Sequence, residues 1–119
     1  MGKVKNGIII YQIESDGCLN GVFTTEISDG YIYNEVANKI TDDFNELCGE
    51  YNCFYFEDGS SHDDVILKIE IKKHMKNTYK VTWTESGNKI FEGIGFKMNE
   101  KQLVVRYETS GLNKIDKVN

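Results

Sequence analysis

Apolar and polar side chains alternate with a period of two along most of this chain. The alternation is clearest in residues 65–72, where Val65, Leu67, Ile69 and Ile71 occupy every second position. Successive side chains of a β-strand point to opposite faces, so this pattern predicts strands with one buried and one solvated side. Together with the Tyr- and Phe-rich segments, such runs predict about eight strands, at residues 9–14, 19–27, 31–37, 50–56, 65–72, 79–84, 89–98 and 102–108.

Short turns separate the predicted strands. Asp16-Gly17, Asp29-Gly30 and Asp58-Gly59 lie between strand runs, and glycine tolerates the positive φ that tight hairpin turns require. Short turns make strands that are neighbours in sequence neighbours in space, and the absence of proline leaves every strand its N–H groups for pairing. Eight strands close into a small barrel. The predicted fold class is therefore all-β: an eight-stranded antiparallel up-and-down β-barrel.

One stretch departs from the strand pattern. Val36, Ile40, Phe44 and Leu47 fall at helical spacing, and Gly49 can end a helix. We therefore expect one short helix near Ile40 to Leu47, between the third and fourth strands, where it could cover one end of the barrel.

The length allows one domain. A chain of 119 residues buries roughly two-thirds of its unfolded surface, enough for one core. We expect a single β-barrel domain over residues 1–119, with frayed tails at residues 1–6 and 111–119. The longest apolar run, Ile8 to Tyr11, is too short for a membrane span or a signal peptide. The sequence therefore predicts a cytoplasmic protein that has no membrane partner.

Charge disfavours nucleic acid as a partner. The chain has 14 Lys and Arg against 19 Asp and Glu, a net charge of −5, which does not suit a surface that neutralises many phosphates. The charge is uneven, because residues 1–64 hold 3 basic and 13 acidic side chains and residues 65–119 hold 11 and 6. This split can steer a charged partner, although solubility alone also explains it.

Three cysteines, Cys18, Cys48 and Cys53, cannot all pair within one chain, which fits a reducing compartment. Cys48 and Cys53 could form a zinc site with two histidines, but this spacing is a weak signal. Cys53 lies among strand-forming residues, where a free cysteine acts as a small hydrophobe. We expect free thiols, no metal and no cofactor.

The strand at 89–98 contains the main candidate for chemistry. If Ile90, Ile94 and Phe96 face inward, strict alternation also turns Glu92 into the lumen, where a carboxylate is costly unless paired or neutral. Alternatively, a bulge at Gly93 returns Glu92 to solvent while Phe91 points in, and this interpretation is favoured because glycine-containing strands often bulge.

Aromatic side chains dominate the predicted interior. There are 7 Tyr, 6 Phe and 1 Trp, and an eight-stranded barrel is just wide enough for packed side chains or for one small ligand. Inward tyrosine hydroxyls need partners, which a buried polar network or a bound molecule could supply. The residues that would contact an interior ligand are Tyr11, Phe23, Tyr51, Tyr79, Trp83, Glu92, Phe96 and Tyr107.

In strand number, meander order and length, the chain resembles the calycin-type small barrels, which include the lipocalins and avidins. It lacks the lipocalin Gly-x-Trp signature, since Ile8 and Ile9 follow Gly7. The pattern Gly49-x-Tyr51, Tyr79-x-Val81-x-Trp83, Gly93-x-Gly95 is similar to one in uncharacterised small bacterial proteins. The resemblance implies a barrel that binds a ligand or a protein, and it brings no catalytic residue.

These observations favour a non-enzymatic binding module. A protein partner on the barrel surface is slightly favoured, because short turns shape no wide mouth and large aromatic rings fill interior volume. The first alternative is a carrier with a small apolar ligand in the lumen. The others are an enzyme that uses Glu92 as acid or base with a nearby Tyr or His, and an antagonist that blocks a partner through the acidic face.

Overall fold

The computed structural model of the chain describes residues 6–27, 30–41, 46–57, 60–61 and 67–110. The described residues form β-strands and connecting turns. The strands are β1 (Asn6–Ile13), β2 (Leu19–Thr25), β3 (Tyr33–Lys39), β4 (Gly49–Glu57), β5 (Ser60–Ser61), β6 (Leu67–Lys73), β7 (Thr78–Glu85), β8 (Asn88–Asn99) and β9 (Gln102–Thr109).

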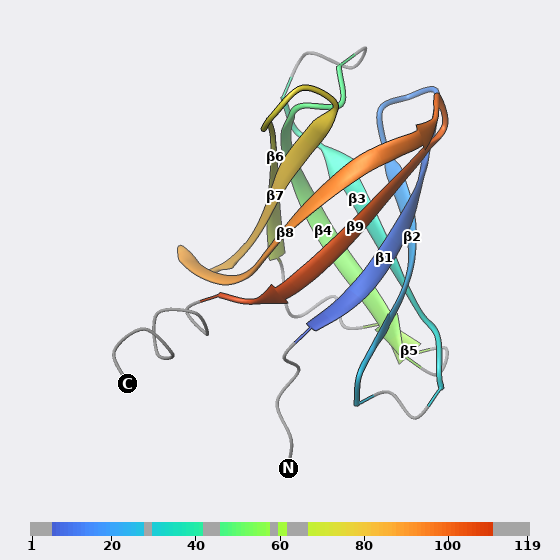
Figure 1. Cartoon of the computed structure of the whole chain (residues 1–119). Helices are drawn as coiled ribbons and strands as arrows, with labels where there is room; N and C mark the ends of the chain where they lie inside the picture. Colours follow the sequence, from blue (N-terminus) through green and yellow to red (C-terminus); the bar gives the residue numbers. More distant parts are fainter. Residues whose placement is uncertain (1–5, 28–29, 42–45, 58–59, 62–66, 111–119) are drawn as a thin grey trace.

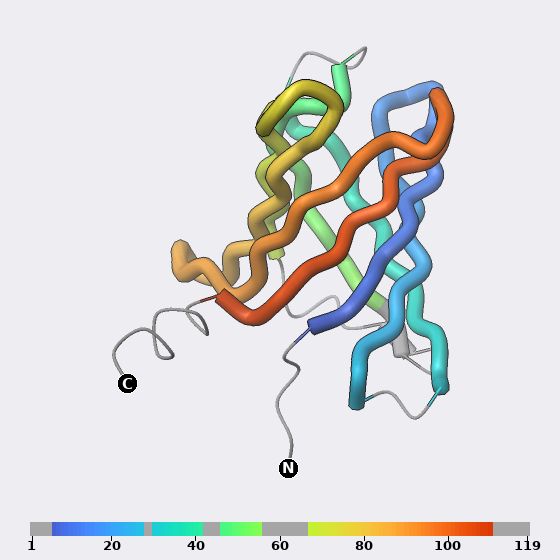
Figure 2. The backbone as a smooth tube through the Cα atoms, in the orientation of Figure 1, coloured from blue at the N-terminus to red at the C-terminus, as the bar shows by residue number. Residues whose placement is uncertain are grey.

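The long strands form a closed antiparallel barrel. The sheet order is β3-β2-β1-β9-β8-β7-β6-β4-β5, and a further pairing of β3 with β4 closes the ring. Each long strand pairs with the next one in the chain, and β9 returns to β1, so the first and last strands lie side by side (Figures 1 and 2). The two-residue β5 pairs with the end of β4 outside the ring. The predicted eight-stranded up-and-down barrel is confirmed.

The β7–β8 hairpin has the turn chemistry that such a meander needs. Glu85 pairs with Asn88, and the two residues between them, Ser86 and Gly87, have φ angles of 51° and 82°. Positive φ at both central residues is the mark of a two-residue turn whose twist matches the strands it joins. Gly17, in the predicted Asp-Gly turn between β1 and β2, likewise has a φ of 89°.

Alternate residues of each strand fill the barrel. Among the residues that the structure describes, fourteen hydrophobic ones are buried, and in β6 and β7 they are residues that period-two alternation predicts. The core contains Ile9, Tyr11, Leu19, Ala37, Tyr51, Cys53, Leu67, Ile69, Ile71, Val81, Trp83, Leu103, Val105 and Tyr107.

The helix predicted near Ile40 to Leu47 is not found in the described part of that segment. Val36 lies within β3, and Ile40, Thr41 and residues 46–48 are not helical. Residues 42–45 lie outside the described residues. The helical spacing of Val36 and Ile40 was misleading, because Val36 takes a place on the outer side of the β3 ladder opposite Asn20. At the N-terminus, Asn6 belongs to β1 instead of to a tail.

A β-bulge in β8 changes which residues face the interior. Trp83 pairs with Phe91 and Thr84 pairs with Lys89, so Ile90 is the extra residue. Phe91 therefore packs against the core, as the favoured interpretation predicts, but the bulge lies before Phe91 and not at Gly93.

The bulge also determines which of the residues after Phe91 face the interior and which face outward. Gly93 and Gly95 take the inward positions opposite Val81 and Tyr79, and Ile94 and Phe96 face outward, with exposed fractions of 41% and 52%. The inward placement predicted for Phe96 is wrong.

Candidate functional site

A carboxylate lies inside the barrel on β3. Glu35 is 6% exposed. It occupies one cross-strand row with Gly21 of β2 and Tyr11 of β1. A Cβ atom at Gly21 would come within 2.9 Å of Cδ1 of Tyr11, so the missing side chain leaves room for the tyrosine ring. Across this gap, the Tyr11 hydroxyl donates a hydrogen bond to Oε2 of Glu35.

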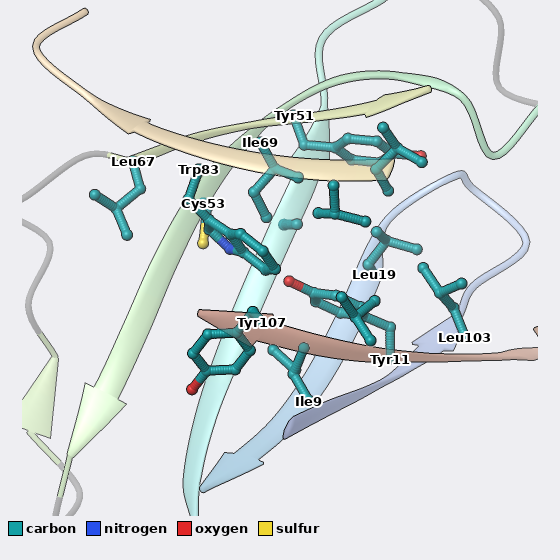
Figure 3. Close-up of a cluster of buried hydrophobic side chains, with 14 residues drawn as sticks. Ile9, Tyr11, Leu19, Tyr51, Cys53, Leu67, Ile69, Trp83, Leu103 and Tyr107 are labelled. Carbon is teal, nitrogen blue, oxygen red and sulfur yellow. The ribbon is translucent and has the colours of Figure 1, made fainter. Parts of the chain in front are cut away.

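Two more side chains face the same carboxylate. Figure 3 shows the Tyr11 hydroxyl, the Cys53 sulfur and the Trp83 ring directed into one region of the core. Burial raises the pKa of Glu35, and the hydrogen bond from Tyr11, together with the nearby polar groups of Cys53 and Trp83, acts in the opposite direction. Burial, together with the charge of Glu35, also raises the pKa values of the Tyr11 hydroxyl and the Cys53 thiol. The carboxylate thus has donors from the protein itself.

Four of the eight predicted ligand-contacting residues are buried in this core. Tyr11 and Tyr51 are 0% and 1% exposed, and Trp83 and Tyr107 are 3% and 6% exposed. The ring centroids of Trp83 and Tyr107 lie 5.4 Å apart, and both rings contact Phe91 edge-on at 6.5 and 5.4 Å. Such tilted and edge-to-face contacts are those of aromatic rings packed against one another.

Two further predicted residues, Phe23 and Tyr79, are partly buried and pack against the core from its margin. The ring centroid of Phe23 lies 5.5 Å from that of Tyr33. The Tyr79 ring is covered by Nζ of Lys73, at 4.8 Å from the ring centroid. Both rings therefore have partners within the protein.

The last two predicted residues do not join the others. Phe96 is exposed on the outer wall. The side chain of Glu92 is 33% exposed, and its Oε1 lies 3.9 Å from Nζ of Lys89. Glu92 therefore does not share the interior site, and the buried carboxylate of this barrel is Glu35.

A second buried ionisable side chain, Lys39, lies against the ring of Tyr51. Lys39 is 8% exposed, and its Nζ donates to the backbone oxygen of Glu46 and lies 5.8 Å from the centroid of the Tyr51 ring. The Tyr51 hydroxyl donates to the backbone oxygen of Leu47 at 2.6 Å. These contacts tie the start of β4 and the segment before it to the end of β3.

The cysteines lie in different environments. Cys53 is buried beside Glu35, whereas Cys18 and Cys48 are partly exposed, and all three are free thiols. The Cys18 thiol donates to Oδ1 of Asn38 at 3.3 Å. In the part of the chain that the structure describes, no three His, Cys, Asp or Glu side chains form a group that could hold a metal ion.

The outer wall carries an unbroken apolar row across four neighbouring strands. Phe96 pairs with Val104, Val104 with Ile10, and Ile10 with Val22, so these side chains share the outer face of their strands. The four strands β8, β9, β1 and β2 are neighbours in the barrel wall (Figure 1). Val22, Ile10 and Phe96 are 47%, 38% and 52% exposed. We call these four residues the outer apolar row. Outward positions of a half-solvated antiparallel sheet are ordinarily polar, which makes this row unusual.

Neither Glu35 nor the outer apolar row was predicted from the sequence. The strand predicted at 31–37 carried a signal for Glu35, since alternation puts it on the same face as Ala37. The outer row required the pairing register of four strands, and the incorrect phase in β8 assigned Phe96 to the interior.

Comparisons with models of protein families, with curated proteins and with solved structures found no match to this chain. Its closed eight-stranded antiparallel barrel is compatible with a calycin-like fold. Among the described residues, no helix is both long enough and apolar enough to cross a membrane.

Proposed function

We propose that this protein is a non-enzymatic binding module that binds a protein partner on the outer face of β8, β9, β1 and β2. The observation that carries the proposal is the outer apolar row. Its four residues are adjacent in register, and three of them are at least 38% exposed. Contiguous exposed apolar residues of this kind are characteristic of interaction surfaces. An exposed aromatic ring such as that of Phe96, at the β8 end of the row, is a typical anchor in protein interfaces.

The closed barrel favours binding on its face over binding at an edge. Because β1 pairs with β9 and β3 with β4, the long strands leave no free edge to which a partner could add a strand. A partner would therefore bury side chains of the wall and form few backbone hydrogen bonds with it. The outer apolar row supplies such side chains.

The alternative of an apolar ligand in the lumen has less support. The interior positions carry large rings, and the Tyr11 hydroxyl already donates to the buried Glu35. A buried carboxylate that awaited a ligand would lack such donors. Glu92 gives little support to an enzyme, because it faces the surface beside Lys89 and away from the interior aromatic residues.

Two finer assignments belong to the same proposal. We propose that the barrel is related to the lipocalin-like calycins and to the small bacterial proteins that its sequence resembles. We also propose a cytoplasmic location, because all three cysteines are free thiols and a reducing compartment keeps them so.

The proposal can be tested with a photo-crosslinking amino acid placed in the protein inside its source cells. It replaces Phe96 in one variant and Lys68, an exposed outward residue of β6, in a matched control. We expect one adduct of defined mass from position 96 and none from position 68. Added wild-type protein should compete for the adduct, and a Phe96→Asp variant should not. Equal adducts at both positions, or no competition by the wild type, would contradict the proposal.

A further inference from the structure

A second cross-strand row borders the outer apolar row. In β8, β9 and β1 this second row lies two residues away from the outer apolar row. Lys72 pairs with Lys80, Lys80 with Ile94, Ile94 with Arg106, and Arg106 with Ile8. We call these five residues the basic row. Two residues of a strand span about 7 Å, so Arg106 lies within one side-chain length of Val104 in the apolar row. Lys80 and Lys72 continue the basic row on β7 and β6, and Nζ of Lys72 lies 3.7 Å from Oε2 of Glu70.

Arg106 occupies the centre of this surface. It is exposed between Ile8 and Ile94, which are 45% and 41% exposed. Within the described residues, the side chains of Arg106 and of the exposed Lys80 have no hydrogen bond or ion pair. Arginine presents a planar fork of donors that fits a carboxylate bidentately, and arginine is enriched in protein interfaces.

The rows follow a fixed order along the strands. On the side of the basic row away from the apolar row, Glu92 of β8 pairs with Glu108 of β9, and Glu92 already lies near Lys89. The order is therefore apolar, basic, acidic. A carboxylate of the partner is attracted where it faces Arg106 and repelled where it faces Glu92 and Glu108. This difference would fix the position of the partner along the strands.

A second copy of this chain does not complement the surface. In a two-fold arrangement that stacks one outer apolar row on another, the axis lies along the strands or along the row. In the first case the basic row faces the basic row of the copy, which carries lysine, arginine and isoleucine but no carboxylate. In the second case, with the axis along the row, the basic row faces the cross-strand row on the opposite side of the apolar row, which contains the Gln12–Gln102 pair. Neither arrangement brings a carboxylate to Arg106.

We propose that the partner is an acidic protein segment whose apolar side chains pack on the outer apolar row and whose carboxylates pair with Arg106 and Lys80. This inference rests on the proposed function and names the chemical class of the partner. The chain as a whole has a net charge of −5, so the attraction arises from this surface alone.

A random 16-residue peptide library displayed on phage can test the inference with purified full-length protein. The baits are the wild type, Phe96→Ala, the double variant Lys80→Gln/Arg106→Gln, and Lys68→Gln as a matched control for a lost surface charge. The substituted side chains are exposed, and circular dichroism checks that each variant is folded. The selected peptides are then synthesised, and their affinities are measured at low and high salt.

We expect the wild type to enrich peptides that combine acidic and apolar residues, in a manner that depends on Phe96. The double variant should bind them about tenfold more weakly, as two rim ion pairs allow, and the salt dependence should fall with it. Lys68→Gln should bind like the wild type. Phe96-dependent enrichment of neutral or basic peptides would overturn the acidic partner but retain the proposed function. Enrichment that does not depend on Phe96, or dimerisation through this face in sedimentation, would overturn both.

Discussion

The hydroxyl of Tyr11 donates a hydrogen bond to the carboxylate of Glu35 in the centre of the barrel, across a position at which β2 carries glycine. A single cross-strand row therefore holds an aromatic donor, a gap and a buried acid. Cys53 and Trp83 lie beside the same acid and lower the cost of its burial. The buried side chains of the described core cluster around this pair, and an exposed apolar surface lies on the outer wall.

Replacement of the buried acid should change how stability depends on pH. Burial raises the pKa of Glu35 above its ordinary value, so the folded protein holds this proton more tightly than the unfolded chain. Relative to Glu35→Gln, the wild type should be most stable below the unfolded pKa and should lose stability as pH rises through the folded pKa. Urea unfolding between about pH 4 and about pH 8 measures this difference.

A matched variant completes this experiment. Glu92→Gln removes a carboxylate from the barrel surface, and its stability profile should keep the shape of the wild-type profile. Parallel profiles for wild type and Glu35→Gln would show that the buried acid does not titrate differently on folding.

Loss of the Tyr11 hydroxyl should destabilise the fold without leaving a large cavity. Tyr11→Phe keeps the buried ring and removes one donor to a buried carboxylate, which typically costs about 1–3 kcal/mol. In a double-mutant cycle with Glu35→Gln, the two costs should sum to more than the cost of the double variant. Strict additivity in urea unfolding would mean that the two side chains are not coupled.

The gap at Gly21 gives a steric prediction. A Cβ atom there would lie 2.9 Å from Tyr11 and from Ile9, so Gly21→Ala should cost about 1–3 kcal/mol through overpacking. It should also change the pH profile, since it displaces the Tyr11 ring from Glu35. Gly87→Ala is the control, because nothing lies within 4 Å of its added Cβ and the cost comes from a φ of +82°. A pH profile that is unchanged in Gly21→Ala would contradict the role of the gap.

Thiol reactivity should follow burial. Cys53 is buried, and Cys18 and Cys48 are partly exposed. In the native protein a thiol reagent should modify Cys18 and Cys48 first, and denaturation without reductant should reveal three reactive groups per chain, the number of cysteines in the sequence. One reactive group, or stoichiometric zinc in elemental analysis, would contradict free thiols.

The strands could be predicted from the sequence because burial on one face imposes period-two alternation. The alternation rule fails in β8, because the extra residue Ile90 changes which face of the strand each later side chain occupies. A shift of one residue sends every later side chain to the other face, which is why Phe96 was assigned to the interior. Bulges leave little trace in a single sequence, and here the glycine at 93 drew attention to the wrong position.

Glu35 was missed for a different reason, although alternation places it on the same face as Ala37. A glutamate within a strand is ordinarily placed on the solvated face, and only its donors make burial tolerable. Tyr11, which donates to Glu35, and Trp83, which lies beside it, are 24 and 48 positions away in sequence and come together through the closure of the barrel. The outer apolar row likewise exists only once four strands are in register.

Trp83 reports directly on whether the barrel has a packed core or a ligand cavity. It is the single tryptophan, it is 3% exposed, and it lies against Tyr107 and Phe91 beside Glu35. In a packed core, Trp83→Ala should cost about 3–5 kcal/mol, as large-to-small core substitutions do.

The most direct test of a packed interior with binding on the outer wall is the fluorescence of Trp83 during titration of the native protein with fatty acids, retinoids and hydrophobic dyes. An indole in a packed core is not reached by such molecules, so we expect no saturable change in Trp83 emission. A saturable response at micromolar concentration, together with a small stability loss in Trp83→Ala, would contradict the account and identify the barrel as a carrier of small apolar ligands.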